Sequence, residues 1–186
     1  SSVVDYHARS LKVREELDDR PGISTSTTEL SIVYSALGDN QTAVQFLRRS
    51  IAMTEQRGGT GELAIQLGNL GLYLSYLNKR DSAEAAYLQS LALFEEIGEK
   101  DGIANSLNNY GVLLEQLGKD EKALANYTRS VGLRRETGNQ GGLALSLWRL
   151  GAYQARQGQL LAAEETLREA LALADQTGIR STVMSV

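Results

Sequence analysis

The side chains that carry most enzyme chemistry are few in this sequence. It has no cysteine and a single histidine, His7, so a zinc site of the usual kind cannot be assembled. Adjacent carboxylates occur twice, as Glu95 with Glu96 and Glu164 with Glu165. Neighbouring side chains of a helix point about 100° apart, so we expect solvated helix faces at both places. We predict no catalytic pair, no metal ligands and no cofactor.

Two further features that could do chemistry also have structural explanations. The stretch "GGTGEL" at residues 58–63 has the glycines of a phosphate loop, but it lacks the preceding strand and the lysine of a P-loop. His7 shares a register position with Leu47 and Tyr87, which predicts a packing role, and we find no partner for it as a general base. The sequence therefore predicts a protein that is not an enzyme.

Charge and hydropathy argue against two classes of partner. The net charge of −4 disfavours a nucleic-acid surface, which requires a basic stripe. No apolar run is long enough to span a bilayer, so we expect no membrane insertion. Cysteine-free chains occur in reducing and oxidising compartments alike. Composition therefore assigns no location, with a cytoplasmic protein as the default and a periplasmic sensor segment as the alternative.

The elements that must position any site recur every forty residues. Alanines share one register position and serines another, at Ala43, Ala83, Ala123 and Ala163, and at Ser10, Ser50, Ser90 and Ser130. Glycines at the same interval follow each apolar-periodic run, as expected where a helix ends in a left-handed residue, at Gly58, Gly98, Gly138 and Gly178. A fixed period in this range is typical of a solenoid of stacked repeats.

Each repeat is predicted to be an antiparallel pair of helices. From Ile103 to Leu117 apolar residues recur at steps of three and four, a turn follows at Gly118, and a second amphipathic stretch runs from Ala123 to Leu133. The predicted organisation is a single array over residues 1–186. It consists of a half repeat at 1–20, full repeats at 21–60, 61–100, 101–140 and 141–180, and the start of a further repeat at 181–186.

These register positions resemble those of the tetratricopeptide repeat. The family's first-helix pattern reads here as Leu107, Tyr110 with Gly111, and Leu114, and its second-helix pattern as Ala123, Tyr127 and Ser130. The period of forty exceeds the usual thirty-four, and is similar to the longer unit of bacterial signalling proteins and of the animal adaptor that couples G-protein subunits to spindle orientation. The resemblance implies an all-α, right-handed solenoid of antiparallel helix pairs whose first helices line a concave groove.

The concave positions of the first helices are the candidate binding surface. Two neighbouring amides, Asn108 and Asn109, are expected to project into the groove, where an amide can both donate to and accept from a peptide backbone. The resemblance implies that an asparagine just before the helix glycine holds ligand backbone. Asn69 and Asn109 match that position, whereas Arg149 does not. The alternative is that these amides are solvated or pack between repeats.

Trp148 has two interpretations, an exposed ligand anchor or packing at the seam between repeats. Arg149 and Arg156 make this part of the groove basic, which favours an acidic or carboxylate-bearing ligand. The full predicted set of partner-binding residues is Asn69, Leu72, Tyr76, Asn105, Asn108, Asn109, Gln116, Trp148, Arg149 and Arg156.

The function predicted from these features is a protein-interaction module that binds a peptide or partner segment in its groove. The alternative is the ligand-sensing segment of a larger signalling protein, such as a bacterial kinase, cyclase or transcription regulator. Because repeats bury their apolar faces only by stacking, we also expect end-to-end self-association through the incomplete terminal repeats.

Overall fold

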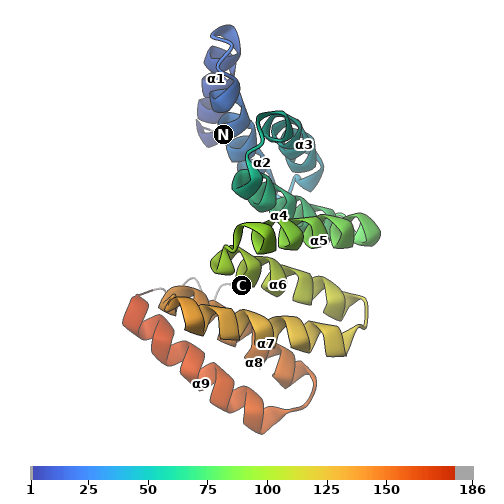
Figure 1. Ribbon diagram of the computed structural model, residues 1–186, viewed down its shortest axis with the longest axis vertical. Helices are drawn as coiled ribbons and strands as arrows, with labels where there is room; N and C mark the ends of the chain where they lie inside the picture. Colours follow the sequence, from blue (N-terminus) through green and yellow to red (C-terminus); the bar gives the residue numbers. More distant parts are fainter. Residues whose placement is uncertain (1, 179–186) are drawn as a thin grey trace. The chain divides into compact units, whose positions relative to one another are not determined.

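The computed structural model describes residues 2–178. In this range the regular elements are nine α-helices, without a strand (Figure 1). The chain divides into two compact units, Ser1–Ile97 and Gly98–Val186. None of the described helices is long and apolar enough to cross a membrane. The predicted start of a further repeat at residues 181–186 lies outside the described range.

The first unit holds five helices, drawn from blue to green in Figure 1: α1 (Ser2–Glu16), α2 (Arg20–Ala36), α3 (Asn40–Arg57), α4 (Thr60–Tyr76) and α5 (Arg80–Ile97). Helix α2 packs most closely on α3, and α4 on α5, while α1 packs on α2 and α3 on α4. The helices therefore form successive pairs, as the apolar periodicity predicts.

The second unit repeats the arrangement with α6 (Lys100–Gln116), α7 (Asp120–Thr137), α8 (Gln140–Arg156) and α9 (Leu160–Thr177). Helix α6 pairs with α7 and α8 with α9, and α7 joins the two pairs by packing on α8. Helices α6 and α8 also contact each other directly. The two first helices of this unit are therefore neighbours. The exact repeat boundaries, and the organisation of both units as one array, stay predictions.

Left-handed residues end the helices where the sequence predicts them. Gly118, between α6 and α7, has φ +66°. Asn78 occupies the corresponding position between α4 and α5, with φ +56°. Asparagine tolerates this conformation better than other non-glycine residues, so both positions make the same tight turn.

Small residues allow the two helices of a pair to approach closely. At Gly111 on α6, a Cβ atom would lie 2.7 Å from Cε1 of Tyr127 on α7, whose side chain is completely buried. The same relationship holds in the first unit between Gly71 and Tyr87, where the corresponding distance is 2.8 Å. The aromatic ring thus fills the space that a glycine leaves on the partner helix.

The serine that recurs every forty residues donates a hydrogen bond from its hydroxyl to the main chain of the partner helix. Ser50 Oγ donates to the carbonyl of Ser24 at 2.8 Å, and Ser90 Oγ donates to that of Ala64 at the same distance. In the second unit, Ser130 Oγ donates to the carbonyl of Ala104 at 2.9 Å. Each bond satisfies a buried hydroxyl and fixes the register of one helix against the other.

Candidate functional site

The second unit contains a cavity of about 280 Å³ beside the contact between α6 and α8. Helix α6 lines it with a valine and two polar residues, α7 contributes a buried tyrosine, and α8 contributes a tryptophan, two arginines and an alanine. These residues are Val112, Glu115, Gln116, Tyr127, Trp148, Arg149, Ala152 and Arg156. The sequence analysis predicted four of them as partner-binding residues: Gln116, Trp148, Arg149 and Arg156. We call this cavity the α6–α8 groove.

A bidentate ion pair crosses the α6–α8 groove. Arg156 Nε donates to Glu115 Oε2 at 3.0 Å, and Arg156 Nη2 donates to Glu115 Oε1 at 2.9 Å. The hydroxyl of Tyr127 donates to the same carboxylate. Burial, together with the hydrogen bond to Glu115 and the charge of that carboxylate, raises the pKa of Tyr127 far above its ordinary value. The phenol is therefore neutral, and the charge of Glu115 is compensated by Arg156.

Arg149 is the groove cation without a compensating acid. Its side chain is half-buried, and the central guanidinium carbon lies 5.8 Å from the centre of the Trp148 ring, a cation–π distance. No carboxylate among residues 2–178 forms an ion pair with it, and its buried Nε has no hydrogen-bond acceptor there. A partly desolvated cation of this kind favours an anionic ligand.

Trp148 packs at the seam between repeats and also lines the α6–α8 groove, while its role as a ligand anchor stays a prediction. Its ring packs against the cluster formed by Val131, Leu143 and Leu147, and it also lines the α6–α8 groove beside Arg149. The side chain is half-buried. Part of the Trp148 ring therefore packs between the helix pairs of the second unit, and the rest of the ring lines the α6–α8 groove.

The structure places Asn108 in the interior, so our expectation that it projects into the groove is wrong. Only 3% of the residue is exposed, and Nδ2 donates to Ser146 Oγ of α8 at 2.9 Å. The corresponding residue of the first unit, Thr28, accepts a hydrogen bond from Gln66 of the following first helix at 3.3 Å. This register position faces the next repeat instead of the ligand surface, which is the alternative interpretation of the amide.

The other predicted residues lie at or near the surface of their own unit. Asn105 is exposed and accepts a hydrogen bond from the buried Arg134. Asn109 is half-buried and has no hydrogen-bond partner among the described residues, and Asn69 of α4 is half-buried as well. Also on α4, Leu72 is half-buried and Tyr76 is 62% exposed. Asn69, Leu72 and Tyr76 belong to the first unit.

Sequence reasoning missed two kinds of polar contact. Glu115 was not in the predicted set, although it stands 41 residues before the oppositely charged Arg156, one repeat earlier in the array. His7 was left without a partner, but its Nδ1 lies 3.1 Å from Glu29 Oε2 of α2. Opposite charges spaced by about one repeat, or a histidine and a carboxylate spaced by about half a repeat, are the signal that would have found both contacts.

Nothing in the described range is arranged to hold a metal ion, since no three histidine or carboxylate side chains there come together. The polar groups of the α6–α8 groove are two arginine donors, the accepting carboxylate of Glu115 and the amide of Gln116, which can donate and accept. A stack of helix pairs with such a groove defines the class, an all-α repeat solenoid.

The chain belongs to the tetratricopeptide-repeat family. The family model matches residues 4–56, 62–136 and 102–176, which together make up most of the sequence. Proteins of this family generally act as non-catalytic scaffolds for protein–protein interaction, and the family match supports such a scaffold role for this chain. A search of curated proteins found no match.

Solved structures share this fold at low sequence identity. BtubC of P. vanneervenii is 21% identical, with a TM-score of 0.77 over 92% of this chain and 72% of that one. A Podospora anserina protein described as a kinesin light chain, with nearly identical TPR-like repeats, is 17% identical, with a TM-score of 0.70 over 94% and 86% of the two chains. MamA is 16% identical, with a TM-score of 0.63 over 91% and 88%. At these identities the likeness concerns the fold alone.

Proposed function

We propose that the α6–α8 groove binds an extended segment of a partner protein and that Arg149 binds a carboxylate of that segment. The observation that carries this proposal is the half-buried Arg149 guanidinium, stacked on Trp148 and without an acidic partner in the described range. A cation in this environment has lost part of its hydration without gaining a counterion. A ligand carboxylate would supply the missing charge and up to two parallel hydrogen bonds.

The rest of the groove supports an extended peptide as the ligand. Gln116 is exposed at its edge and can donate to and accept from a peptide backbone. Val112 and Ala152 supply apolar surface between the polar groups. Glu115 and Arg156 neutralise each other in an ion pair. Arg149 is therefore the groove charge that is left to anchor a ligand. Asn109 on α6 and, in the first unit, Asn69, Leu72 and Tyr76 stay in the proposed partner-binding set, as does Asn105.

The regulatory alternative uses the same surface. In a ligand-sensing segment of a larger signalling protein, occupancy of the groove would be passed to another domain. That alternative stays a prediction, and the groove experiment below applies to it equally because both functions begin with ligand binding.

The proposal is tested by selecting ligands with the whole chain and then removing the anchor. A library of random peptides displayed with free carboxyl termini is selected against the chain, and the affinities of the selected peptides are measured by fluorescence anisotropy. We expect enrichment of Asp, Glu or a terminal carboxylate, and the loss of a charged hydrogen-bonding partner in Arg149→Gln should weaken binding roughly ten- to a hundredfold.

The matched control is Arg168→Gln on α9. This substitution removes the same charge from an exposed arginine whose partner, Glu164, lies one turn away on the same helix. It should leave affinity within about twofold, since exposed helical pairs contribute little. Selected peptides without acidic groups, or peptides that bind Arg149→Gln as tightly as the unmodified chain, would refute the proposed role of the groove.

A further inference from the structure

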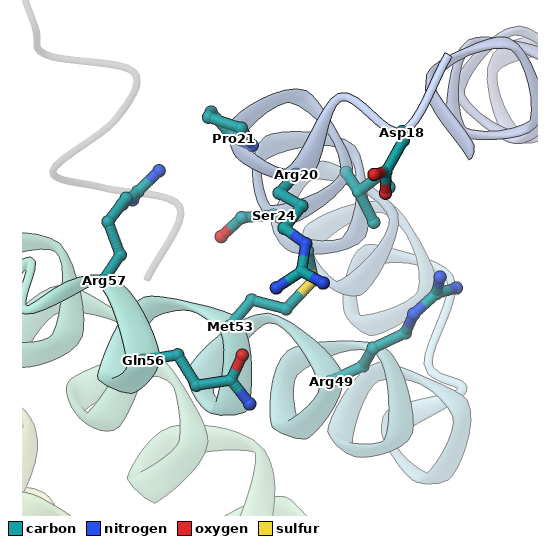
Figure 2. Close-up of a pocket in the computed structure, with 9 residues that line it drawn as sticks. Asp18, Arg20, Pro21, Ser24, Arg49, Met53, Gln56 and Arg57 are labelled. Atoms are coloured by element: carbon teal, nitrogen blue, oxygen red, sulfur yellow. The ribbon is translucent and has the colours of Figure 1, made fainter. Parts of the chain in front are cut away.

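The first unit contains a second cavity, of about 520 Å³, where the turn between α1 and α2 meets the start of α2 and the end of α3 (Figure 2). Its lining combines three arginines with a carboxylate, a few uncharged polar groups and apolar side chains. These residues are Asp18, Arg20, Pro21, Ile23, Ser24, Arg49, Met53, Gln56 and Arg57. We call it the α2–α3 pocket.

The corresponding corner of the second unit is neutralised by its own side chains. Asp101 at the start of α6 accepts hydrogen bonds from Thr137 at 3.0 Å and Asn139 at 3.2 Å, and it pairs with the buried Arg134. The Nζ atom of Lys100 lies 2.9 Å from Glu136 Oε2. Arg134 fills the space above the start of α8, because a Cβ at Gly142 would lie 2.6 Å from its Nε.

Register-equivalent residues of the first unit cannot make these contacts. Two repeats earlier in the sequence, Pro21 stands in place of Asp101, Thr54 in place of Arg134 and Gln56 in place of Glu136. Both carboxylates that neutralise the corner in the second unit are therefore missing. The long Arg134 side chain is replaced by Thr54, which is buried and donates a hydrogen bond to Glu62, the residue in place of Gly142. Beside the ion pair of Glu62 with Arg57, this corner of the first unit retains an open pocket.

The cation at the position of Lys100 is nevertheless kept, and two further arginines line the pocket. Arg20 occupies the position of Lys100, and no carboxylate in the described range forms an ion pair with it. Arg49 pairs with Glu15 through Nη2, and Arg57 pairs with Glu62 through Nη2. A guanidinium has five N–H donors, so each of these two arginines retains donors after its single contact.

The apolar residues give the pocket a floor beneath the charges. Figure 2 shows the Arg20 side chain reaching toward Met53, with Arg49 and Arg57 on either side and Gln56 below. Ile23 is buried and Met53 is half-buried, so a ligand that enters between the arginines meets hydrocarbon. A volume in this range, with apolar walls and a few convergent polar groups, is typical of sites for small molecules.

We infer that the α2–α3 pocket binds a small organic anion whose phosphate or carboxylate group is held by Arg20, with Arg49 and Arg57 beside it, and whose apolar part packs on Met53 and Ile23. Guanidinium groups bind both oxyanions through parallel hydrogen bonds. At the positions of Pro21 and Gln56 the chain supplies no carboxylate, and a carboxylate or phosphate from outside the chain thus takes that place. This site lies in the first unit and is separate from the α6–α8 groove.

Binding is tested on the whole chain by isothermal titration calorimetry and by shifts of backbone amide NMR signals. The probes are phenyl phosphate, benzoate and inorganic phosphate. We expect the tighter of the two aromatic anions to bind with a Kd of about 1 mM or below. Inorganic phosphate should bind roughly tenfold more weakly, because it buries no apolar surface. The tighter aromatic probe identifies whether the headgroup is a phosphate or a carboxylate.

Arg20→Gln and Lys100→Gln form the matched pair of variants. Each removes one positive charge at the same register position, but only Arg20 lines the pocket. Arg20→Gln should weaken the aromatic anion roughly tenfold through the lost charged hydrogen bonds, and Lys100→Gln should leave its affinity unchanged. Met53→Ala should weaken the aromatic probe but not inorganic phosphate.

Three results would overturn the inference. The first is the absence of heat and of signal shifts for both aromatic anions at concentrations well above the expected Kd. The second is an equal loss of affinity in Arg20→Gln and Lys100→Gln, which would show attraction to the general surface charge. The third is a set of shifted signals that lies outside α2, α3 and the turn before them.

Discussion

Asn108 on α6 donates a hydrogen bond to Ser146 on α8 at 2.9 Å, and Ser146 is in turn hydrogen-bonded to Ser130 on α7, also at 2.9 Å. These three side chains, all buried, join three helices of the second unit. A buried polar chain of this kind specifies how one helix pair sits on the next, because a shifted register would leave its members without partners.

Asn108→Ala should therefore destabilise the protein. The substitution removes one buried hydrogen bond and leaves a small void, while it also removes the unpaired buried Oδ1, so the net loss should be about 1–2 kcal/mol. Chemical denaturation followed by circular dichroism measures it. The neighbouring Asn109→Ala is the control, since Asn109 is half-buried and has no hydrogen-bond partner in the described range. Equal stability of the two variants would contradict the structural role of Asn108.

The double variant Asn69→Ala with Asn109→Ala should weaken ligand binding without destabilising the fold. Both side chains are half-buried and occupy the same register position on α4 and α6. Helicity and melting temperature should stay almost unchanged, while affinity for a peptide selected as described above should fall roughly thirtyfold through lost backbone contacts, since each of the two hydrogen bonds contributes about 1 kcal/mol. Unaltered affinity would remove these two asparagines from the proposed binding surface.

Gly111→Ala should destabilise the second unit even though alanine is the better helix former. The new Cβ would lie 2.7 Å from a Tyr127 ring that is completely buried and tied through its hydroxyl to Glu115, so the ring cannot give way easily. Overpacking of this kind costs about 1–3 kcal/mol. Thermal and chemical unfolding of the variant measure the effect.

The matched control for that substitution is Gly132→Ala on α7. A Cβ at Gly132 meets nothing within 4 Å, so the substitution should stabilise the helix by roughly 0.5–1 kcal/mol. The two glycine variants should thus shift the unfolding midpoint in opposite directions. A stabilising Gly111→Ala would show that the two helices do not approach as closely as the structure indicates.

Asp101 should make stability depend on pH. Burial would raise the pKa of Asp101, but hydrogen bonds from Asn139 and Thr137 and the nearby Arg134 outweigh it, so the pKa lies below its ordinary value. The ionised Asp101 carboxylate therefore adds to the free energy of unfolding above its pKa in the unfolded chain, about 4. This contribution is lost as the pH falls through the lower pKa of the folded chain. Asp101→Asn should therefore be clearly less stable than the unmodified chain at pH 7, and the difference should shrink toward pH 3.

The control for this experiment is Asp81→Asn on α5, which removes the same charge from an exposed position. Its effect on the free energy of unfolding should stay within about 0.5 kcal/mol across the pH range. Denaturant titrations at closely spaced pH values measure both variants. A pH-independent difference for Asp101→Asn would mean that the carboxylate charge does not stabilise the corner.

Self-association stays a prediction, with a second copy of the chain as the expected partner. Helix α1 exposes Val3 at 51% and Tyr6 at 69%, and α9 exposes Leu160 at 69% and Leu161 at 85%. Sedimentation velocity over a concentration series should show a rising average mass, which Tyr6→Ser with Leu161→Ser should reduce, because burial of these side chains drives the contact. A single monomeric species at every concentration would contradict this expectation.

The repeated local structure can be predicted from the order of the amino acids alone. The amino-acid sequence shows the forty-residue period, the apolar spacing within each helix and the residues that make left-handed turns. These features follow from contacts between residues close in sequence, so periodicity is sufficient to predict them.

Which polar side chains face a neighbouring helix and which face solvent depends on the packing of the folded chain. Asn108 and Asn109 are adjacent and chemically identical, yet only Asn108 is buried against the next helix pair. The pairing of Glu115 with Arg156 likewise depends on how one repeat is placed against the next, and the opening of the α2–α3 pocket depends on how the turn before α2 meets α3. That placement results from side-chain packing between residues far apart in sequence, and a hydrophobic period carries no information about it.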